Sequence, residues 1–557
     1  MADTHTRNLC VEIIHSQFGP LTSKLASVLL NRGRLSLIQL ARFADLKPRT
    51  TRACVLVLVQ QNILWHTKGD DGTEMFEVNV DDCIMRLRFG KFVWLTDKIF
   101  GKEAADIVRV ILDHGKLKPP DIMIQLSVYE PKSTSFSLVI EIIQQPTSLE
   151  IKQYSSALHK LVSGTYLKPS TILSHLSPRD KCIQYEAEEK RKIVGFPTAK
   201  ELREAKDVAQ ARLKREEEEA EQVGLKRKAK DQPGPRSNKR KTSEDEDVVN
   251  DDAYFRVNYA RFGIHIRNAM IEQAAKDRFN LGASIVIQAA LKATENSQVD
   301  LSDCRSPPTS VSNIAVHIPE DADLASGLVY PSKNVPNLTC VKDYLGMLAS
   351  ADNPTPEGRA SSFVSYSSSK IQVEFEIIGR RLRQEIVEAV ARDKHGPEGV
   401  RILRLLSTTG KMDEKQISKI VMIAPKDVRP LLVALSTDSL ISTQEVPKSA
   451  DRNPARTFYL WYVDLQKAYQ VILGNVYKTL FNIAARRRSE RENSEVSVVL
   501  QKRERSDVSQ DESLLTRLER EILKEWELKE EKLTILEMRV EEVVFLLKDL
   551  GSYKQEP

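Results

Sequence analysis

One stretch of this chain occurs twice, and the repetition limits what the chain can fold into. Residues 33–65 read GRLSLIQLARFADLKPRTTRACVLVLVQQNILW, and residues 410–442 read GKMDEKQISKIVMIAPKDVRPLLVALSTDSLIS. The copies align without a gap, with apolar positions on apolar positions and basic on basic. Aligned pairs include Gly33 with Gly410, Phe43 with Ile420, Pro48 with Pro425, Arg49 with Lys426, Arg52 with Arg429, and Leu58 with Leu435. Such distant copies indicate one small folding unit that is used twice.

Each copy predicts a helix, a turn, a second helix and a β-hairpin. Residues 37–43 carry apolar side chains three and four apart, which is typical of a short amphipathic helix. Pro48 ends that helix, because the residue before a proline avoids the helical conformation. Thr50 is the expected N-cap of the second helix, over residues 51–62. A hairpin over residues 63–80 completes the order of a winged helix, which is a helix-turn-helix with an added hairpin.

Composition places few limits on function. The 557 residues leave room for about three to five domains. No apolar run approaches the ~18 residues of a membrane span, and the polar start shows no signal peptide. The six cysteines show no CxxC spacing, so we expect neither a zinc site nor disulfides, and a reducing compartment. The net charge of +5 mixes both signs, so bulk charge does not predict nucleic-acid binding.

Motifs for catalysis are absent from the sequence. It contains no GxxxxGK[ST], no GxGxxG after a strand, no HExxH and no GxSxG. Asp70, Asp71 and Glu74 could form a metal site, but the flanking glycines favour an acidic hairpin tip. We therefore predict no enzyme active site, no metal, no cofactor and no small-molecule substrate.

The predicted fold is mainly α with small β-hairpins: four tandem winged-helix domains followed by a C-terminal coiled coil. Within the second domain, residues 180–250 carry 35 charged residues out of 71, which predicts a disordered insertion. The predicted domains are residues 1–81 (winged helix one), 82–257 (winged helix two with the insertion), 258–376 (winged helix three), 377–488 (winged helix four), and 489–557 (linker and coiled coil).

A heptad pattern near residues 514–550 predicts the coiled coil. Leu533, Val540 and Leu547 alternate with Leu536, Val543 and Leu550 at steps of three and four. The partner helix is either the one expected from Val463 or a helix of another protein. The residues expected to pack against partners are Val55, Val59, Leu533, Leu536, Val540, Val543 and Leu547.

Basic residues of the two repeats are the candidates for DNA contact. They stand at the start of the helix that enters the major groove in DNA-reading winged helices, or on the wings. The candidates are Lys47, Arg49, Arg52, Lys68, Lys426, Arg429, Lys448, Arg452 and Arg456. However, residues 54–59 are six apolar residues in a row, and a helix that is apolar on all sides is buried on all sides. We therefore expect this helix to pack against protein or contact phosphates rather than read bases.

Two basic clusters in the charged insertion form a candidate nuclear import signal. The alternative is an ordinary solvated run of charge, but an import signal needs the accessibility that a disordered segment provides. The residues are Lys226, Arg227, Lys228, Lys239, Arg240 and Lys241.

The chain resembles one known family in the order of its parts. The resemblance rests on the opening CVEII at residues 10–14, the stretch 35–65, the charged insertion, the strand TFYLW at residues 457–461, and the C-terminal heptads. These features are similar to the third-largest subunit of DNA-directed RNA polymerase III, in a fungal version. The family is akin to the alpha subunit of general factor IIE, whose usual zinc ribbon has no matching cysteine spacing here.

The resemblance implies a nuclear, non-catalytic accessory subunit. Its expected partners are two other polymerase III-specific subunits, the clamp of the largest subunit, and promoter DNA held mostly by backbone contacts. Its expected role is to help initiation and promoter opening for transfer RNA and 5S ribosomal RNA genes. Two alternatives remain open, namely a free-standing winged-helix DNA-binding regulator and a scaffold of another nuclear complex.

Overall fold

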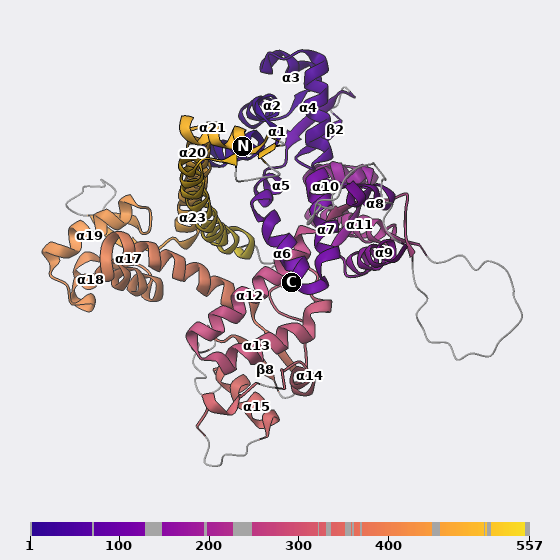
Figure 1. Ribbon diagram of the computed structural model, residues 1–557. Helices are drawn as coiled ribbons and strands as arrows, with labels where there is room; N and C mark the ends of the chain where they lie inside the picture. The colour runs from indigo at the N-terminus through magenta and orange to yellow at the C-terminus, as the bar shows by residue number, and fades with distance from the viewer. Residues whose placement is uncertain are drawn as a thin grey trace, which may run out of the picture. The chain divides into compact units, whose positions relative to one another are not determined.

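The computed structural model describes residues 3–68, 72–128, 148–193, 198–226, 248–320, 322–329, 336–350, 358, 361–367, 370–447, 457–505, 507–508 and 514–551. The chain is mainly helical, with small antiparallel sheets (Figure 1). It divides into two compact units, Met1–Phe262 and Gly263–Pro557. Each unit is described by itself below.

The first part of the first unit has the order that the repeat predicts. Three strands form a sheet in the order β1-β3-β2, and Leu64 pairs with Val78 at the base of the hairpin. Leu25, Leu40 and Leu58 are fully buried, so consecutive helices share one core. The elements are α1 (Thr4–Phe18), α2 (Pro20–Arg32), β1 (Leu35–Ser36), α3 (Leu37–Ala44), α4 (Pro48–Gln60), β2 (Leu64–Lys68) and β3 (Glu74–Val78).

Helix α4 begins earlier than the sequence predicts, and Thr50 is not its N-cap. Lys47 is the N-cap residue, and Pro48 occupies the first helical position. A proline costs little there, because the first turn has no use for its missing N–H and its φ already suits a helix. The expectation that Pro48 separates the helices is confirmed, but the second helix includes it.

The second part of the first unit surrounds a small aromatic core. The ring centroids of Phe92 and Phe262 lie 5.0 Å apart, and those of Phe100 and Tyr166 lie 4.9 Å apart. The sheet pairs β4 with β7, and the charged insertion lies between these two strands in the sequence. The elements are α5 (Val80–Met85), η1 (Arg86–Arg88), α6 (Phe89–Phe100), α7 (Lys102–His114), α8 (Pro119–Val128), α9 (Ser148–Ser163), β4 (Leu167–Ser170), η2 (Ile172–His175), β5 (Leu225–Lys226), β6 (Val248–Val249) and β7 (Tyr254–Val257).

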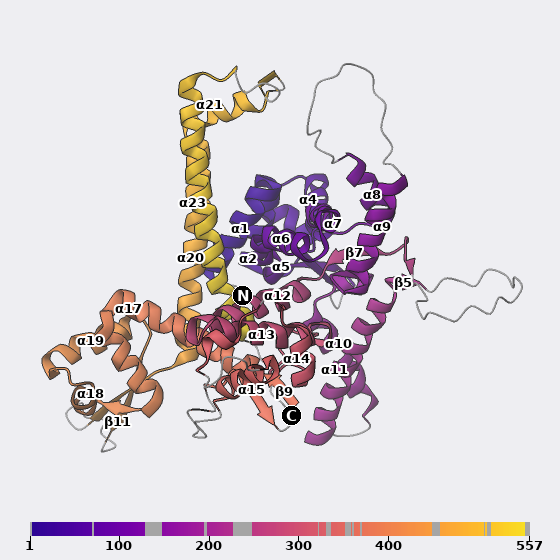
Figure 2. The ribbon, with the colours of Figure 1, turned by 60° about the horizontal axis from the view of Figure 1, so that its bottom comes forward.

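The prediction of disorder is wrong for most of the described part of the charged insertion. Two helices, α10 (Pro178–Lys192) and α11 (Ala199–Gln222), pack against each other (Figure 2). Arg212 pairs with Glu188 at 2.8 Å across the two helices. Ala205 and Ala209 give α11 a narrow buried stripe, at 5% and 2% exposure. The sequence gives little sign of such a stripe, because its many charged residues dominate the hydropathy. The small alanines pack the helix in place while the charged side chains remain in solvent.

The second unit begins with a helical group and a hairpin. Its core gathers apolar side chains from α13, α15 and the two strands, and includes the fully buried Tyr344. The second strand of its hairpin ends at Val373, and α17 begins two residues later at Phe375. The elements are α12 (Tyr259–Arg278, which starts within the first unit), α13 (Leu281–Thr294), η3 (Glu295–Ser297), α14 (Val311–Val316), η4 (Ala325–Gly327), α15 (Asn337–Leu348), β8 (Val364–Ser367) and β9 (Lys370–Val373).

The second copy of the repeat folds like the first. Ser36 and Asp413 each form a capping box with the glutamine three residues later. The following helix ends in a left-handed residue in both copies, Asp45 and Met422. The sheet order β10-β12-β11 also matches the first copy. The elements are α17 (Phe375–Thr409), β10 (Met412–Asp413), α18 (Glu414–Val421), α19 (Pro425–Thr437), β11 (Ser442–Pro447) and β12 (Thr457–Tyr462).

The chain then forms a long antiparallel helix pair of α20 (Leu465–Glu492) and α23 (Arg517–Lys548), connected through α21 (Ser494–Arg503) (Figure 2). Lys529 reaches Glu490 at 3.4 Å, whereas Leu547 packs in the cluster that contains Tyr469 and Ile472. Arg487 of α20 pairs with Glu530 and Glu537 of α23, both at 2.8 Å. The 3₁₀ turn η7 (Asp549–Gly551) follows α23.

Most of the predicted heptad residues of α23 and η7 are buried or half-buried, including Leu550 at 1% exposure. Leu547 is buried, and Leu533 and Val540 are half-buried. Val543 is half-buried against the core of the second repeat. Leu536, however, is 45% exposed. Glu530 and Glu537, one position along the helix from the row of Leu536, lie on the side of α23 that meets α20.

Candidate nucleic-acid and protein interface

The start of α4 is an exposed basic surface. Lys47, Arg49 and Arg52 are exposed, and within the described residues neither arginine has a hydrogen-bond or ion-pair partner. The first turn of α4 contains no acidic residue, and no side chain caps it. The helix dipole and the free N–H groups of this turn therefore add to the positive charge of the arginines. This arrangement favours an anion such as a phosphate group.

The same helix continues the exposed surface with apolar side chains. Leu56 is 63% exposed and Val57 is 43% exposed, and on α3 Ile38 is 83% exposed. The prediction that residues 54–59 are buried on all sides is therefore wrong. Only one side of α4 meets the core, where Cys54, Val55 and Leu58 are buried. An apolar run that covers the whole circumference of such a helix leaves apolar groups in solvent.

The second copy presents an equivalent surface. Val433 is 54% exposed at the position of Leu56, and Ile420 is 52% exposed at the position of Phe43, which is 41% exposed. Met422, between α18 and α19, is 91% exposed. Both copies thus keep apolar side chains in solvent at the same places. Since the core does not use them, they are available for contact with a partner.

The N-terminal turns of α4 and α19, which carry the basic residues, differ between the two copies. Lys426 is exposed, as Arg49 is, but Nη2 of Arg429 lies 3.0 Å from Oε1 of Glu414. The first turn of α19 also contains Asp427. The second copy is therefore less attractive to an anion than the first.

Three matches to family models cover much of the chain. The RNA polymerase III subunit RPC82 helix-turn-helix domain matches residues 8–66, RNA polymerase III subunit RPC82 matches residues 156–376, and the POLR3C C-terminal winged-helix domain matches residues 387–463. The chain belongs to the RPC82 family of RNA polymerase III subunits. The resemblance seen in the sequence is thereby confirmed.

Relatives that match the chain over nearly its whole length are also RNA polymerase III subunits. The chain is 25% identical to DNA-directed RNA polymerase III subunit RPC-3 of Coccidioides immitis, over 98% of this chain and 99% of the relative. It is also 25% identical to DNA-directed RNA polymerase III subunit rpc3 of Aspergillus niger, over 99% and 100%. Both relatives are from fungi, as the resemblance implied.

The RPC82 family models place both surfaces within named domains. The helix-turn-helix model covers α3 and α4, and the winged-helix model covers α18 and α19. The exposed apolar residues were missed when the repeat was considered only as a core pattern. The signal was present, because the repeat keeps apolar residues at Phe43 and Leu56 although buried neighbours already complete the core face.

Several predicted residues of this RPC82 family member lie outside the surface or outside the described residues. Val55 is buried in the core at 5% exposure, and Val59 is half-buried. Lys68 ends β2 and is exposed, and its register partner is Glu74. The other candidates outside the described residues are Lys448, Arg452 and Arg456 of the fourth wing, and Arg227, Lys228, Lys239, Arg240 and Lys241 of the insertion. Lys226 is the last residue of β5.

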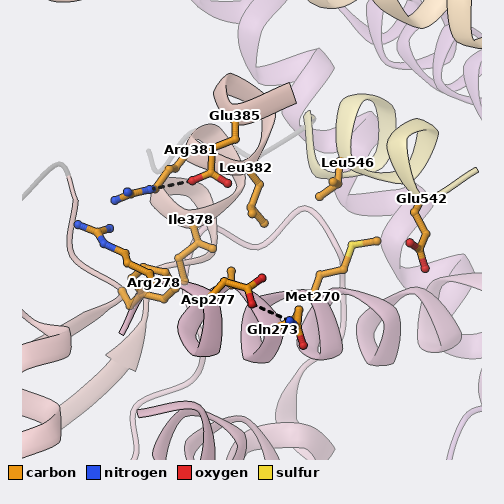
Figure 3. A pocket seen from close by; sticks show the side chains of 12 residues that line it. Met270, Gln273, Asp277, Arg278, Ile378, Arg381, Leu382, Glu385, Glu542 and Leu546 are labelled. Atoms are coloured by element: carbon orange, nitrogen blue, oxygen red, sulfur yellow. Dashed lines mark hydrogen bonds and ion pairs between the residues drawn. The ribbon is translucent and has the colours of Figure 1, made fainter. Parts of the chain in front are cut away.

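One pocket of about 380 Å³ lies in the second unit, between α12, α17 and α23 (Figure 3). Apolar side chains such as Met270, Leu382 and Leu546 line it. Of its polar groups, Arg381 pairs with Glu385 at 3.3 Å, and Gln273 donates a hydrogen bond to Asp277 at 2.8 Å. None of the predicted site residues lines this pocket.

Two kinds of feature are absent from the described part of the chain. No cluster of three or more His, Cys, Asp or Glu side chains there could hold a metal ion. No helix there combines the length and apolarity that crossing a membrane would need.

Proposed function

We propose that the chain is a non-catalytic peripheral subunit of RNA polymerase III that aids initiation and promoter opening for small RNAs such as transfer RNA and 5S ribosomal RNA. In this proposal it acts with two other polymerase III-specific subunits on the clamp of the largest subunit, in the nucleus. The observation that carries the proposal is the repeated surface in which an exposed basic helix start adjoins exposed apolar side chains. Such a surface suits a subunit that holds protein and DNA together.

The apolar part of the surface would dock on polymerase subunits. Leu56 and Val433 lie on the outer sides of α4 and α19, more than half exposed. Burying a leucine side chain stabilises an interface by roughly 1.5–3 kcal/mol. Two such surfaces would attach the subunit at two points, and the α20–α23 pair, as a two-helix coiled coil, would add a third.

The basic part would contact phosphates of upstream or melted DNA. Arg49 in the first turn of α4 and Arg52 in the next turn are exposed near the helix start, where the helix dipole also favours an anion. Backbone contacts of this kind are independent of sequence and weaken with salt. A polymerase subunit needs this property, because it acts at many promoters.

The four tandem winged helices and the import signal belong to the same proposal. Each predicted domain would supply one helix-turn-helix surface, and the two copies of the repeat would be the ones that contact DNA and the clamp. The basic clusters around residues 226–230 and 238–241 would carry the subunit into the nucleus.

Replacing Lys47, Arg49 and Arg52 with Glu is expected to lower transcription initiation from a transfer RNA gene about tenfold, because three phosphate contacts are lost. The fold should remain, since the three side chains are exposed. The measurement is multiple-round and single-round transcription by the reconstituted polymerase, with thermal unfolding of the subunit in parallel.

The matched control replaces Lys24, Lys102 and Lys160 with Glu, which changes the net charge equally at exposed positions elsewhere in the same unit. Normal initiation with the first variant would exclude the DNA role of α4. Equal loss with both variants would show a general charge effect instead.

Replacing Leu56 or Val433 with Asp is expected to weaken incorporation of the subunit into the polymerase about tenfold, because each change puts a charge into an apolar contact. The measurement is co-purification of polymerase subunits with the tagged variant, calibrated against a salt series. Ile183→Asp is the matched control, since Ile183 is 55% exposed on α10. Undiminished incorporation of both variants would contradict docking through the repeats.

A further inference from the structure

Lys116, Arg256 and Lys168 occupy neighbouring positions across adjacent strands in the small sheet that contains β4 and β7. The N–H of Leu117 donates to the carbonyl of Phe255 at 3.2 Å, and the N–H of Phe255 donates back at 2.8 Å. This antiparallel pair places Lys116 opposite Arg256 on one side, and Lys168 pairs with Arg256 on the other. Opposite residues of neighbouring strands lie about 5 Å apart, so like charges in such a row repel each other.

Two histidines add to the same cluster. Nζ of Lys116 lies 2.8 Å from Nε2 of His175, which belongs to η2. The ring of His66, on β2, lies 6.5 Å from the ring of His175. The cluster therefore joins the wing of the first helix-turn-helix to the sheet of the following domain, within one compact unit.

Burial makes this concentration of positive charge unfavourable. Lys116 is 6% exposed, and burial lowers its pKa to about 8, with Arg256 as a second cause. Burial also lowers the pKa of His175 to about 4, and interactions with Lys116, His66 and Arg256 lower it further. The neighbouring charges thus all act against protonation.

Two cations of the cluster, Lys116 and Arg256, have no counter-charge among the described residues. No carboxylate among the described residues forms an ion pair with Lys116 or Arg256. Two residues after Lys168, on the same face of β4, Oγ of Ser170 is buried and has no hydrogen-bond partner within the described part of the chain. Buried charges in proteins are normally paired, because an unpaired one costs several kcal/mol.

We infer that Lys116, Arg256, His66 and His175 form a binding site for an oxyanion of the phosphate type. The lysine and arginine supply charge, the imidazole N–H groups donate hydrogen bonds, and the hydroxyl of Ser170 lies along the same sheet face. Because Lys116 is almost buried, the site suits a single small group rather than the continuous backbone of a duplex. The site is separate from the α4 and α19 surfaces and does not rest on the proposed function.

The first test titrates sodium phosphate into the full chain at constant ionic strength and follows binding by calorimetry. Phosphate should bind, and Lys116→Met should weaken the binding at least tenfold while keeping the apolar stem of the lysine. The matched control Lys102→Met removes an exposed lysine of the same unit and should leave the affinity unchanged. If a single-stranded oligonucleotide competes with phosphate, the anion comes from a nucleic acid. If the oligonucleotide does not compete, the anion is a free ion.

Two outcomes would overturn the site. Equal phosphate affinity in the wild type and the Lys116→Met variant would mean an adventitious ion only. No phosphate binding at all would mean that Lys116 is satisfied by the hydrogen bond from its Nζ to Nε2 of His175 and needs no anion.

The pH dependence of stability provides a second readout. Without an anion, the pKa of Lys116 is about 8 in the folded chain and its ordinary value is 10.5. Between these values the unfolded chain binds more protons, so the free energy of unfolding rises with pH in this window. Bound phosphate raises the pKa of the folded lysine and should flatten that rise. An identical pH profile with and without phosphate would contradict the site.

Discussion

Replacing Gly115 with Ala should destabilise the first unit by at least ~4 kcal/mol, because a backbone clash adds to backbone strain. A Cβ at this position would lie 2.3 Å from the carbonyl oxygen of Gln60 and 2.8 Å from Cα of Gln61. Gly115 also has a φ of +83°, in the region that favours glycine. Urea unfolding of the full chain, followed by circular dichroism, measures the loss.

The reason for so large an effect is a tight contact between the ends of two helices. Nε2 of Gln61 donates to the carbonyl of Asp113 at 2.7 Å, and Nε2 of Gln60 donates to that of Lys116 at 2.7 Å. These bonds hold the end of α4 against the turn after α7. A methyl group on Gly115 would push the two apart and break them.

Gly101→Ala is the matched control for this prediction. Gly101 has a φ of +93°, but a Cβ there would meet nothing closer than Oε2 of Glu103 at 3.5 Å. This variant should lose only the ~1 kcal/mol or so of backbone strain. Equal losses at the two glycines would show that the clash with α4 has no effect.

Replacing Leu547 with Asp should detach α23 from the second repeat and lower the free energy of unfolding of the second unit by about 4 kcal/mol. Leu547 is 6% exposed and packs in the cluster of Tyr469 and Ile472, where a carboxylate finds no partner in that cluster. Limited proteolysis of the full chain should then cleave within α23.

Leu536→Asp tests the register of the same helix. Leu536 is 45% exposed, so the change should cost less than about 0.5 kcal/mol. If the two variants were equally unstable, Leu536 would pack in the seam of the helix pair, as the heptad pattern predicts. Loss of polymerase incorporation with a normal unfolding curve would instead assign Leu536 to a partner.

The repeat made much of the fold predictable. The two helices and the paired strands of both copies follow from apolar spacing, Pro48 and the returning strand at residues 457–461, and the structure confirms them except for the start of α4. The insertion was less predictable, because Ala205 and Ala209 contribute too little to hydropathy to reveal a packed helix among so many charges. The charge pattern describes only the local composition of the insertion. The helices α10 and α11 are ordered because they pack against each other, and a local pattern does not contain that information.

The candidate surface was predictable in its basic part only. Arg49, Arg52 and Lys426 stand where the helix-turn-helix order places them. The exposure of Leu56 could not be deduced from the unbroken apolar run alone, since the run does not tell which side meets the core; only the matching apolar residue in the second copy, Val433, indicated it. The pairing of Arg429 with Glu414 also escaped the sequence, because the two are 15 residues apart and meet only when α18 and α19 pack.

The position of Leu547 has a consequence for the order of events during synthesis. The core of the second repeat contains side chains from α17, α18 and α19, together with Leu547 and the half-buried Val543 from α23. This domain therefore emerges from the ribosome with one side of its core open, and residues 464–542 must be made before the closing helix exists. At translation rates of ~5–20 residues per second, the opening lasts roughly 4–16 seconds. During that interval the exposed apolar side is a place where a chaperone or another polymerase subunit could engage the nascent chain.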